Sequence, residues 1–185
     1  MTRELSGKRL ELLKEVVPKL SRVGILQTAD AITKASDYKR YEAEARGLKL
    51  QLQSFEVRTP NPDFQSAFND AAKARLGAMI TISYSALSRN SKRIAELAIK
   101  NRLPMMFESS QHVEAGGLVS YAADETESYG RAAVHVDKLL KGAKPADIPV
   151  EQPMRFEFVI NLNTAKQIGL TVPPEILARA TRIIR

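Results

Sequence analysis

Short apolar segments alternate with longer amphipathic segments through most of the chain, and this alternation constrains the fold more than any other feature. The segments 22–26, 78–82, 104–107 and 118–121 have the short length and apolar character of strands, and 48–57 alternates at Leu50, Leu52 and Phe55 in the manner of a strand. Strands that alternate with helices form βαβ units, and right-handed crossovers place helices on both faces of a mostly parallel sheet. The sequence therefore predicts an α/β fold with a doubly wound, mostly parallel sheet.

Capping and stop residues bound the predicted helices. Ser6 is expected to cap the first helix, which Pro18 closes, and Gly47 is expected to stop the second. A further strand, exposed on one face, is predicted over 151–160. The expected helices cover 6–17, 33–47, 64–77, 88–101, 125–140, 161–169 and 173–184.

Composition excludes several classes of protein. With 185 residues, 44% hydrophobic and 26% charged, the chain can bury a full core. It contains no cysteine, which excludes disulfides, iron–sulfur clusters, thiol catalysis and zinc–thiolate sites. No apolar run approaches the roughly 20 residues that span a bilayer, and residues 1–10 lack the apolar core of a signal peptide. The chain as written is therefore expected to be soluble, without an export signal, and cytoplasmic.

The net charge of +7 is not concentrated in one part of the sequence. Acidic and basic residues interleave, as in the segment 39–46, which predicts a solvated mixed surface rather than a nucleic-acid site. The exception is the carboxyl end, where Arg179, Arg182 and Arg185 have no acidic neighbours after Glu175. We expect no nucleic-acid partner.

The motifs of nucleotide-binding and hydrolytic enzymes are absent. No glycine-rich loop follows a predicted strand, and neither HExxH nor GxSxG occurs. The chain has two histidines, His112 and His135. His112 follows a polar strand exit and is the better candidate proton carrier, but it has no evident partner. We expect no enzymatic activity, no metal site and no cofactor.

Hydrogen-bonding and aromatic residues cluster where the predicted strands end, at the edge where ligands bind in doubly wound sheets. Two roles are open for Glu108. It could act as a general base if it is buried, or it could bind an ammonium or amide group of a ligand. Helix capping is an alternative role for the serine, threonine and aspartate residues, and it explains the two tyrosines least well. The predicted ligand-binding residues are Thr28, Asp30, Tyr84, Ser85, Glu108, Ser109 and Tyr121.

Three stretches carry a resemblance to a known family. They are LSGKRLELLKEVVPKLSRV at 5–23, VEAGGLVSY at 113–121 and LLKGAKPADIPVEQPMRFEFVINLNTAKQIGLTVPP at 139–174. These stretches resemble the substrate-binding proteins of a family of bacterial ABC transporters. The resemblance implies a type I periplasmic binding protein, in which ligand is trapped between two doubly wound lobes joined by a three-stranded hinge.

The resemblance also implies a domain organisation. Residues 1–117 and 150–185 correspond to the second, flavodoxin-like lobe, and residues 118–149 to a hinge strand and a helix that packs on the first lobe. A first lobe of roughly a hundred residues and an export signal precede the matching segment in full-length relatives, which are periplasmic. The first lobe is largely missing from this sequence.

The implied function is that of a solute-binding component of an ABC uptake transporter, with an amino acid or aromatic compound as ligand and a permease as partner. The alternative is a cytoplasmic small-molecule sensor or regulatory domain of the same fold. A homodimer is also expected, because a helix without its first lobe would expose an apolar stripe. The stripe consists of Tyr129, Ala132, Ala133, Val136 and Leu140.

Overall fold

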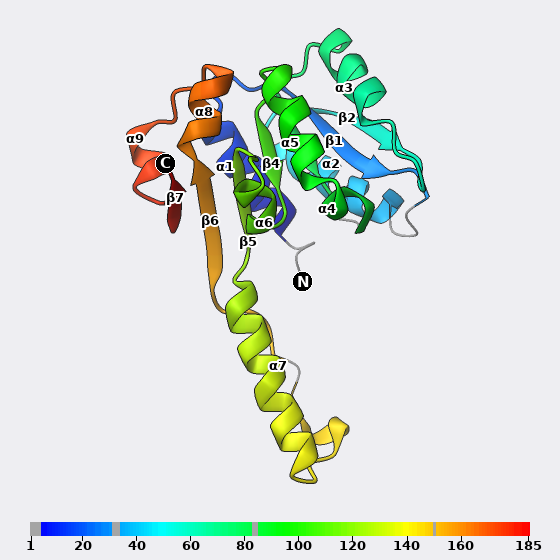
Figure 1. Ribbon diagram of the computed structural model, residues 1–185, viewed down its shortest axis with the longest axis vertical. Helices are drawn as coiled ribbons and strands as arrows, with labels where there is room; N and C mark the ends of the chain where they lie inside the picture. Colours follow the sequence, from blue (N-terminus) through cyan, green and yellow to red (C-terminus); the bar gives the residue numbers. More distant parts are fainter. Residues whose placement is uncertain (1–4, 31–33, 83–84, 150) are drawn as a thin grey trace.

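The computed structural model describes residues 5–30, 34–82, 85–149 and 151–185, which form a sheet-based body and a protruding arm (Figure 1). The described strands form one seven-stranded sheet in the order β2-β1-β3-β4-β5-β6-β7. Strands β1 to β5 are parallel to one another. Strand β6 is antiparallel to β5, and β7 is parallel to β6. The predicted α/β fold is confirmed. The strands are β1 Arg22–Thr28, β2 Gln51–Val57, β3 Ala78–Thr81, β4 Met105–Phe107, β5 Val119–Ala123, β6 Phe156–Asn161 and β7 Arg182–Ile184.

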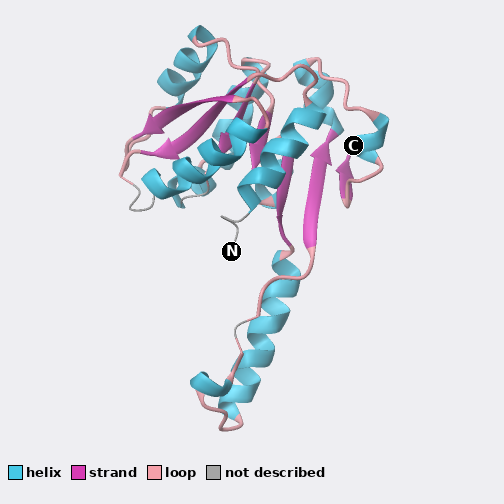
Figure 2. Ribbon diagram, turned by 180° about the vertical axis from the view of Figure 1, so that it is seen from behind, coloured by secondary structure: helices cyan, strands magenta, loops and turns pink. Residues whose placement is uncertain are grey.

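Helices cover both faces of the sheet, as doubly wound topology requires (Figures 1 and 2). One hydrophobic cluster lies under α1, α2, α8 and α9, and the other lies under α3, α4 and α5. The helices are α1 Ser6–Val16, α2 Lys34–Gly47, α3 Phe64–Lys73, α4 Ser85–Arg89, α5 Ser91–Lys100, α6 Ser110–Glu114, α7 Glu125–Leu140, α8 Leu162–Ile168 and α9 Pro174–Leu177, with a short 3-10 turn at Pro145–Asp147. Within the described residues, no helix has the length and apolar character needed to cross a bilayer.

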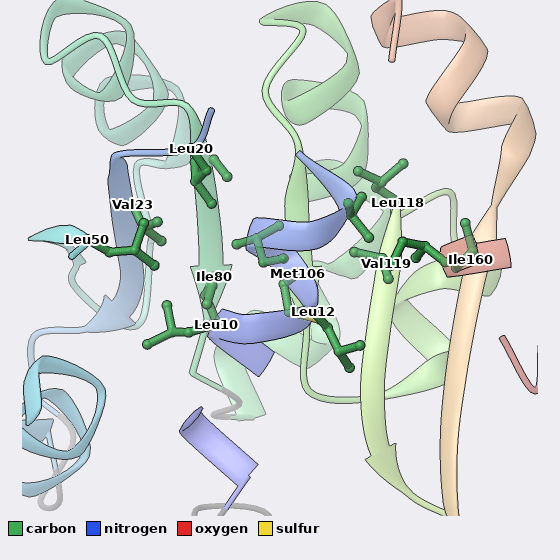
Figure 3. Packing of buried hydrophobic residues seen from close by; sticks show 14 of the residues in the cluster. Leu10, Leu12, Leu20, Val23, Leu50, Ile80, Met106, Leu118, Val119 and Ile160 are labelled. Atoms are coloured by element: carbon green, nitrogen blue, oxygen red, sulfur yellow. The ribbon is translucent and has the colours of Figure 1, made fainter. Parts of the chain in front are cut away.

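The alternation of side chains along β1 explains why the sheet is buried on both faces. Val23 and Ile25 point into the cluster under α1, whereas Leu26 points into the cluster under α3 to α5. Figure 3 shows Leu10 and Leu12 of α1 lying over the central strands of the first cluster. Strands buried on both faces give continuous apolar runs in a sequence, which is the signal that predicted them.

Two residues after the end of each of α2, α3 and α5, a basic residue has a left-handed backbone conformation. The residues are Lys49, Arg75 and Arg102, with φ of 56°, 52° and 49°. A leucine follows each one, and its N–H bonds the carbonyl oxygen five residues back, as Leu103 does to Ala98 at 2.9 Å. This is the Schellman type of helix end, in which the residue after the left-handed position packs its side chain back on the helix.

Several predicted helix boundaries are wrong. The first helix has Leu5 at its N-cap position, with Ser6 already helical, so the predicted Ser6 cap is not formed. Gly47 is the last residue of α2 rather than the left-handed stop, which is Lys49. The predicted helix 88–101 is two helices, α4 and α5, separated at Asn90.

The last predicted helix is also wrong in its second half. Helix α9 ends at Leu177, and residues 182–184 form β7, which pairs with β6. Two consecutive isoleucines favour a strand, and the open edge of β6 provides the partner. Helix α6 was not predicted, because five residues are too few to show a helical period. The strand predicted from residue 151 begins at Phe156.

The arm consists of α7 and the segment that returns to β6. Strands β5 and β6 are antiparallel from Val119↔Ile160 to Ala123↔Phe156, and together they lead out of the sheet into the arm (Figure 1). Asp124 caps α7 by accepting hydrogen bonds from two backbone N–H groups of the first turn. No residue of α7 is buried. The proposed division into a lobe and a hinge-plus-helix segment stays a prediction.

Candidate functional site

The candidate site is the edge of the sheet where β1, β3, β4 and β5 end, which we call the carboxyl edge. Parallel strands bring their carboxyl ends to one edge, so residues far apart in the sequence meet there. The α7 arm leaves the body at this same edge (Figure 1). Of the predicted ligand-binding residues, Tyr84 lies outside the described residues.

The predicted residues differ in exposure. Thr28 is the last residue of β1 and is buried, whereas Asp30, just beyond it, is exposed. Ser85 is the exposed first residue of α4. Glu108 and Ser109 follow β4 directly, the first buried and the second partly buried. The edge therefore has a buried layer and an exposed layer.

Glu108 belongs to the buried layer and forms an ion pair with Arg9 of α1. The Arg9 Nη1 and Glu108 Oε1 atoms are 2.6 Å apart, and the two side chains are 0% and 6% exposed. The Tyr41 hydroxyl of α2 donates to the same oxygen at 3.1 Å. Buried charges need such partners because desolvation is costly. Glu108 is thus oriented by two donors from the helices that cover one face of the sheet.

Tyr41 stays a neutral hydrogen-bond donor in this cluster. Burial, and secondarily the negative charge of Glu108, raises the pKa of Tyr41 far above its usual value. Arg9 also donates from Nε to the Tyr121 carbonyl oxygen at 2.8 Å, which ties α1 to β5. The cluster therefore holds β4 and β5 in fixed positions where they reach the carboxyl edge.

Asp30 belongs to the exposed layer. The Thr59 hydroxyl donates a hydrogen bond to its carboxylate. That hydrogen bond, with smaller contributions from backbone donors and from Arg58, lowers the pKa of Asp30. A shallow hollow of about 430 Å³ adjoins this carboxylate, and it is lined by Ala29, Asp30, Glu56, Arg58 and Thr59. Asp30 is an anion available to a cationic group.

Ser109 serves as a helix cap and also contacts the base of the arm. Its hydroxyl oxygen accepts from the Gln111 N–H at 3.3 Å and donates to Glu125 Oε1 at 3.2 Å. The Gln111 amide donates to the other Glu125 oxygen at 2.9 Å. Since Glu125 begins α7, these bonds join the start of α6 to the start of the arm. Capping, the alternative role weighed for Ser109, is observed.

His112 is a residue of α6, and its side chain is buried in the body. Its ring stacks on Phe107, with centroids 5.2 Å apart, and 2% of the residue is exposed. Within the described part of the chain, neither ring nitrogen has a hydrogen-bond partner. Burial lowers the pKa of His112, and the Glu125 carboxylate partly opposes this. A neutral ring packed in this way is a core residue rather than a proton carrier.

Tyr121 is partly buried on the face of the sheet that α1 covers. Its ring stacks on Phe156 at 5.8 Å and meets Phe158 edge-on at 6.4 Å. Phe158 is its partner across the β5–β6 pair. The aromatic group therefore reinforces the strands that lead to the arm.

Sequence reasoning missed Arg9, Tyr41, Gln111 and Glu125. Arg9 carried a usable signal, because it shares helical spacing with Leu13 and lies on the face that the first helix buries. A charged residue at a core position requires a buried partner. The sequence contains many carboxylates, so the identity of that partner becomes visible only in the fold.

The described residues of the carboxyl edge present charged and hydrogen-bonding groups that can hold a small ligand. The described residues contain no group of three or more histidine, aspartate or glutamate side chains that could hold a metal ion. The sheet is mostly parallel, has helices on both faces and contains one antiparallel pair, β5–β6. This arrangement matches the periplasmic binding protein type of α/β fold. The chain belongs to the ABC transporter substrate binding protein family, whose family model matches residues 3–184. The resemblance seen in the sequence is confirmed.

The chain is also similar to individual proteins and solved structures. The chain is 21% identical over 167 residues to a tyrosine-binding protein of Clostridioides difficile, covering 88% of this chain and 47% of the relative. A Streptococcus pneumonia ABC domain in complex with L-Trp matches with a TM-score of 0.84 and 23% identity, covering 97% of this chain and 62% of that one. A conserved domain protein from Vibrio cholerae also matches with a TM-score of 0.84 at 23% identity, covering 96% and 60%. The chain therefore spans about half to three fifths of the length of these relatives.

Proposed function

We propose that this chain is a solute-binding lobe of an ABC uptake system and that an amino acid or aromatic compound binds at its carboxyl edge. The observation that carries the proposal is the departure of the β5–β6 pair and α7 from that same edge. In a two-lobed binding protein, the segments that connect the two lobes lie next to the edge that binds the ligand. Closure of the lobes about these segments then traps the ligand. The ligand would lie between this edge and a first lobe.

The chemistry of the edge supports an amino-acid ligand. An amino acid presents an ammonium group, a carboxylate and a side chain. Asp30 offers an exposed carboxylate to the ammonium group, and Ser85 offers an exposed hydroxyl. The relatives described as binding tyrosine and L-Trp make aromatic amino acids the first ligands to test.

The alternative function is a cytoplasmic small-molecule sensor. The fold alone does not separate the two, because a LacI family transcriptional regulator from Bifidobacterium animalis also matches, with a TM-score of 0.60 at 13% identity. The family match favours the transport system. A permease partner and a periplasmic location accordingly belong to the proposal, which includes no enzymatic activity and no nucleic-acid partner.

Isothermal titration calorimetry with L-Trp, L-Tyr and L-Phe tests the proposal. We expect Asp30→Asn to weaken binding by about 1 to 3 kcal/mol, as for loss of a charged hydrogen-bond partner. Tyr84→Ala is expected to weaken it by about 1 to 3 kcal/mol, as for loss of an aromatic contact. Asp70→Asn, an exposed carboxylate on α3, is the matched control. If Asp30→Asn and Tyr84→Ala both bind like the wild-type chain and the control, Asp30 and Tyr84 do not form the site.

The homodimer is a second part of the proposal. Tyr129, Val136 and Leu140 of the predicted apolar stripe are 73%, 54% and 84% exposed. Val134 and Leu139 are exposed as well, so apolar groups surround much of the helix. A second copy that presents the same helix would cover them in a two-fold contact. Light scattering at micromolar concentration should report twice the chain mass, and Leu140→Glu should restore the monomer.

A further inference from the structure

The edge of the sheet opposite the carboxyl edge carries a row of basic residues, which we call the basic row. Lys19, Lys49, Arg75 and Arg102 all have left-handed backbone conformations, with φ between 49° and 66°. They lie two or three residues before β1, β2, β3 and β4, respectively. Because the strand order is β2-β1-β3-β4, the four residues follow one another along the edge as Lys49, Lys19, Arg75 and Arg102.

Neighbouring strands are about 4.8 Å apart, so folding gathers onto one edge charges that are dispersed in the sequence. All four residues of the basic row are exposed. None of them forms an ion pair with any residue that the structure describes. The sequence predicted a mixed surface, and at this edge the surface is basic.

Carboxylates close to the helix ends at this edge already have basic partners of their own. The pairs are Glu15 with Arg179 at 2.6 Å, Asp70 with Lys73 at 2.9 Å and Glu114 with Arg182 at 2.7 Å. Arg179 and Arg182 have no acidic neighbours in the sequence, but each pairs with a carboxylate in the folded chain. These three carboxylates therefore pair with other cations and not with the basic row.

The choice of residue at these turns is not explained by backbone geometry. Glycine is the residue that a left-handed helix end favours. The chain uses it at Gly116, Gly142 and Gly169. The helix dipole does not explain the choice either. A lysine in the last helical turn, such as Lys73 of α3, already interacts favourably with the dipole without a left-handed backbone conformation. A basic side chain at the sheet edge is what these turns have in common.

We propose that the basic row is a docking surface for a membrane carrying anionic lipid headgroups. The turns 18–22, 48–51, 74–77 and 101–104 contain no aromatic residue on which a base could stack. A contact made by charge alone suits a dense phosphate surface, to which clustered lysine and arginine residues bind. The strands separate the basic row from the carboxyl edge, so docking leaves the ligand edge and the arm free.

Co-sedimentation with vesicles tests the proposal. The vesicles contain phosphatidylcholine alone or phosphatidylcholine and phosphatidylglycerol in equal amounts. The test variant is Lys19→Gly, Lys49→Gly, Arg75→Gly and Arg102→Gly together, since glycine suits each backbone conformation. The control variant, Lys39→Gln, Lys92→Gln, Lys138→Gln and Lys144→Gln, removes the same charge from exposed residues elsewhere. Circular dichroism and thermal unfolding establish that both variants fold.

The wild-type chain and the control should bind the anionic vesicles and not the neutral ones. Each cation at such a surface contributes roughly a fivefold factor, so the test variant should bind roughly several hundredfold more weakly. Binding should also fall as ionic strength rises, because salt screens exposed charges. Three results would overturn the proposal. They are no binding by the wild-type chain at low salt, equal losses in the two variants, or binding to single-stranded DNA with none to anionic vesicles.

Discussion

The body and the α7 arm both contain regular helices, yet they are stabilised in different ways. In the body, Phe68, Ile80 and Phe107 are 0% exposed, and each element packs on a neighbour. In the arm, Tyr129 is 73% exposed and Leu140 is 84% exposed. Local sequence therefore determines where a helix forms, whereas a packing partner determines whether the helix adds to the cooperative core.

Within the described residues, the arm is stabilised by a helix cap and by ion pairs between its own residues. Asp124 caps α7, and Arg131 pairs with both Glu127 and Glu151. Exposed pairs of this kind contribute about 0.2 to 0.5 kcal/mol each, and isolated helices of about 15 residues are marginal in water. The arm therefore needs a covering surface, from a first lobe or from a second copy, to be as stable as the body.

The largest contrast is expected between large-to-small substitutions in the two regions. Phe68→Ala removes a fully buried ring from the cluster under α3 and should lower the free energy of unfolding by about 4 kcal/mol. Leu140→Ala in the arm of the monomer should change it by less than about 0.5 kcal/mol. Urea unfolding followed by circular dichroism measures both. A large loss from Leu140→Ala under monomeric conditions would show that the arm is part of the core.

The second largest effect is expected at the buried ion pair. Arg9→Met leaves Glu108 buried without its cation and should destabilise the body by about 3 kcal/mol. Adding Glu108→Gln should recover part of this loss, because it removes the uncompensated charge. Arg93→Met, at an exposed arginine of α5, is the control and should have little effect. If the double variant is no more stable than Arg9→Met, charge burial is not the cause.

The fold was predictable to the extent that it depends on local patterns. Continuous apolar runs such as 78–82 identify strands buried on both faces, and they gave the parallel sheet. The ends of elements depend on tertiary partners instead. Residues 182–184 form a strand because the edge of β6 is open beside them, and no local signal contains that fact.

The candidate site was predictable as a location but not as a network. Strand exits identified Glu108 and Asp30 at the carboxyl edge. Their different environments, one buried beside Arg9 and the other exposed beside Thr59, come from helices and loops distant in the sequence. The basic row was missed for the same reason, since its successive members are 26 to 30 residues apart in the sequence and become neighbours through the strand order.

The third prediction concerns pH and the buried ring of His112. Because burial lowers its pKa, the folded state holds the neutral ring while the unfolded chain titrates near 6.5. This contribution to stability is present above pH 6.5 and is lost as the pH falls below it toward the lowered pKa. His112→Phe keeps the stack on Phe107 and should therefore lose less stability between pH 8 and pH 5 than the wild-type chain.

The control for the pH experiment is His135→Phe, which lies on the arm. Its pH dependence of unfolding should match that of the wild-type chain, because no residue of α7 is buried. Unfolding by urea at several pH values provides the comparison. A pH profile of His112→Phe identical to the wild-type profile would mean that the acid loss arises from other groups.

The smallest effect is expected at the left-handed turns that the body and the arm share. Arg75 has φ of 52° before β3, so Arg75→Gly relieves a conformation that a side chain disfavours and should stabilise the body by about 0.5 to 1 kcal/mol. Lys73→Gly, two residues earlier in α3, should destabilise it by about 1 kcal/mol.

Gly142→Ala places a side chain at φ of 95° at the end of α7. Because α7 is not packed on the body, Gly142→Ala should leave the midpoint of global unfolding unchanged while lowering helix content in the arm, which hydrogen exchange at 138–143 would detect. A global loss from Gly142→Ala equal to that from Lys73→Gly would mean that the arm and the body unfold as one unit.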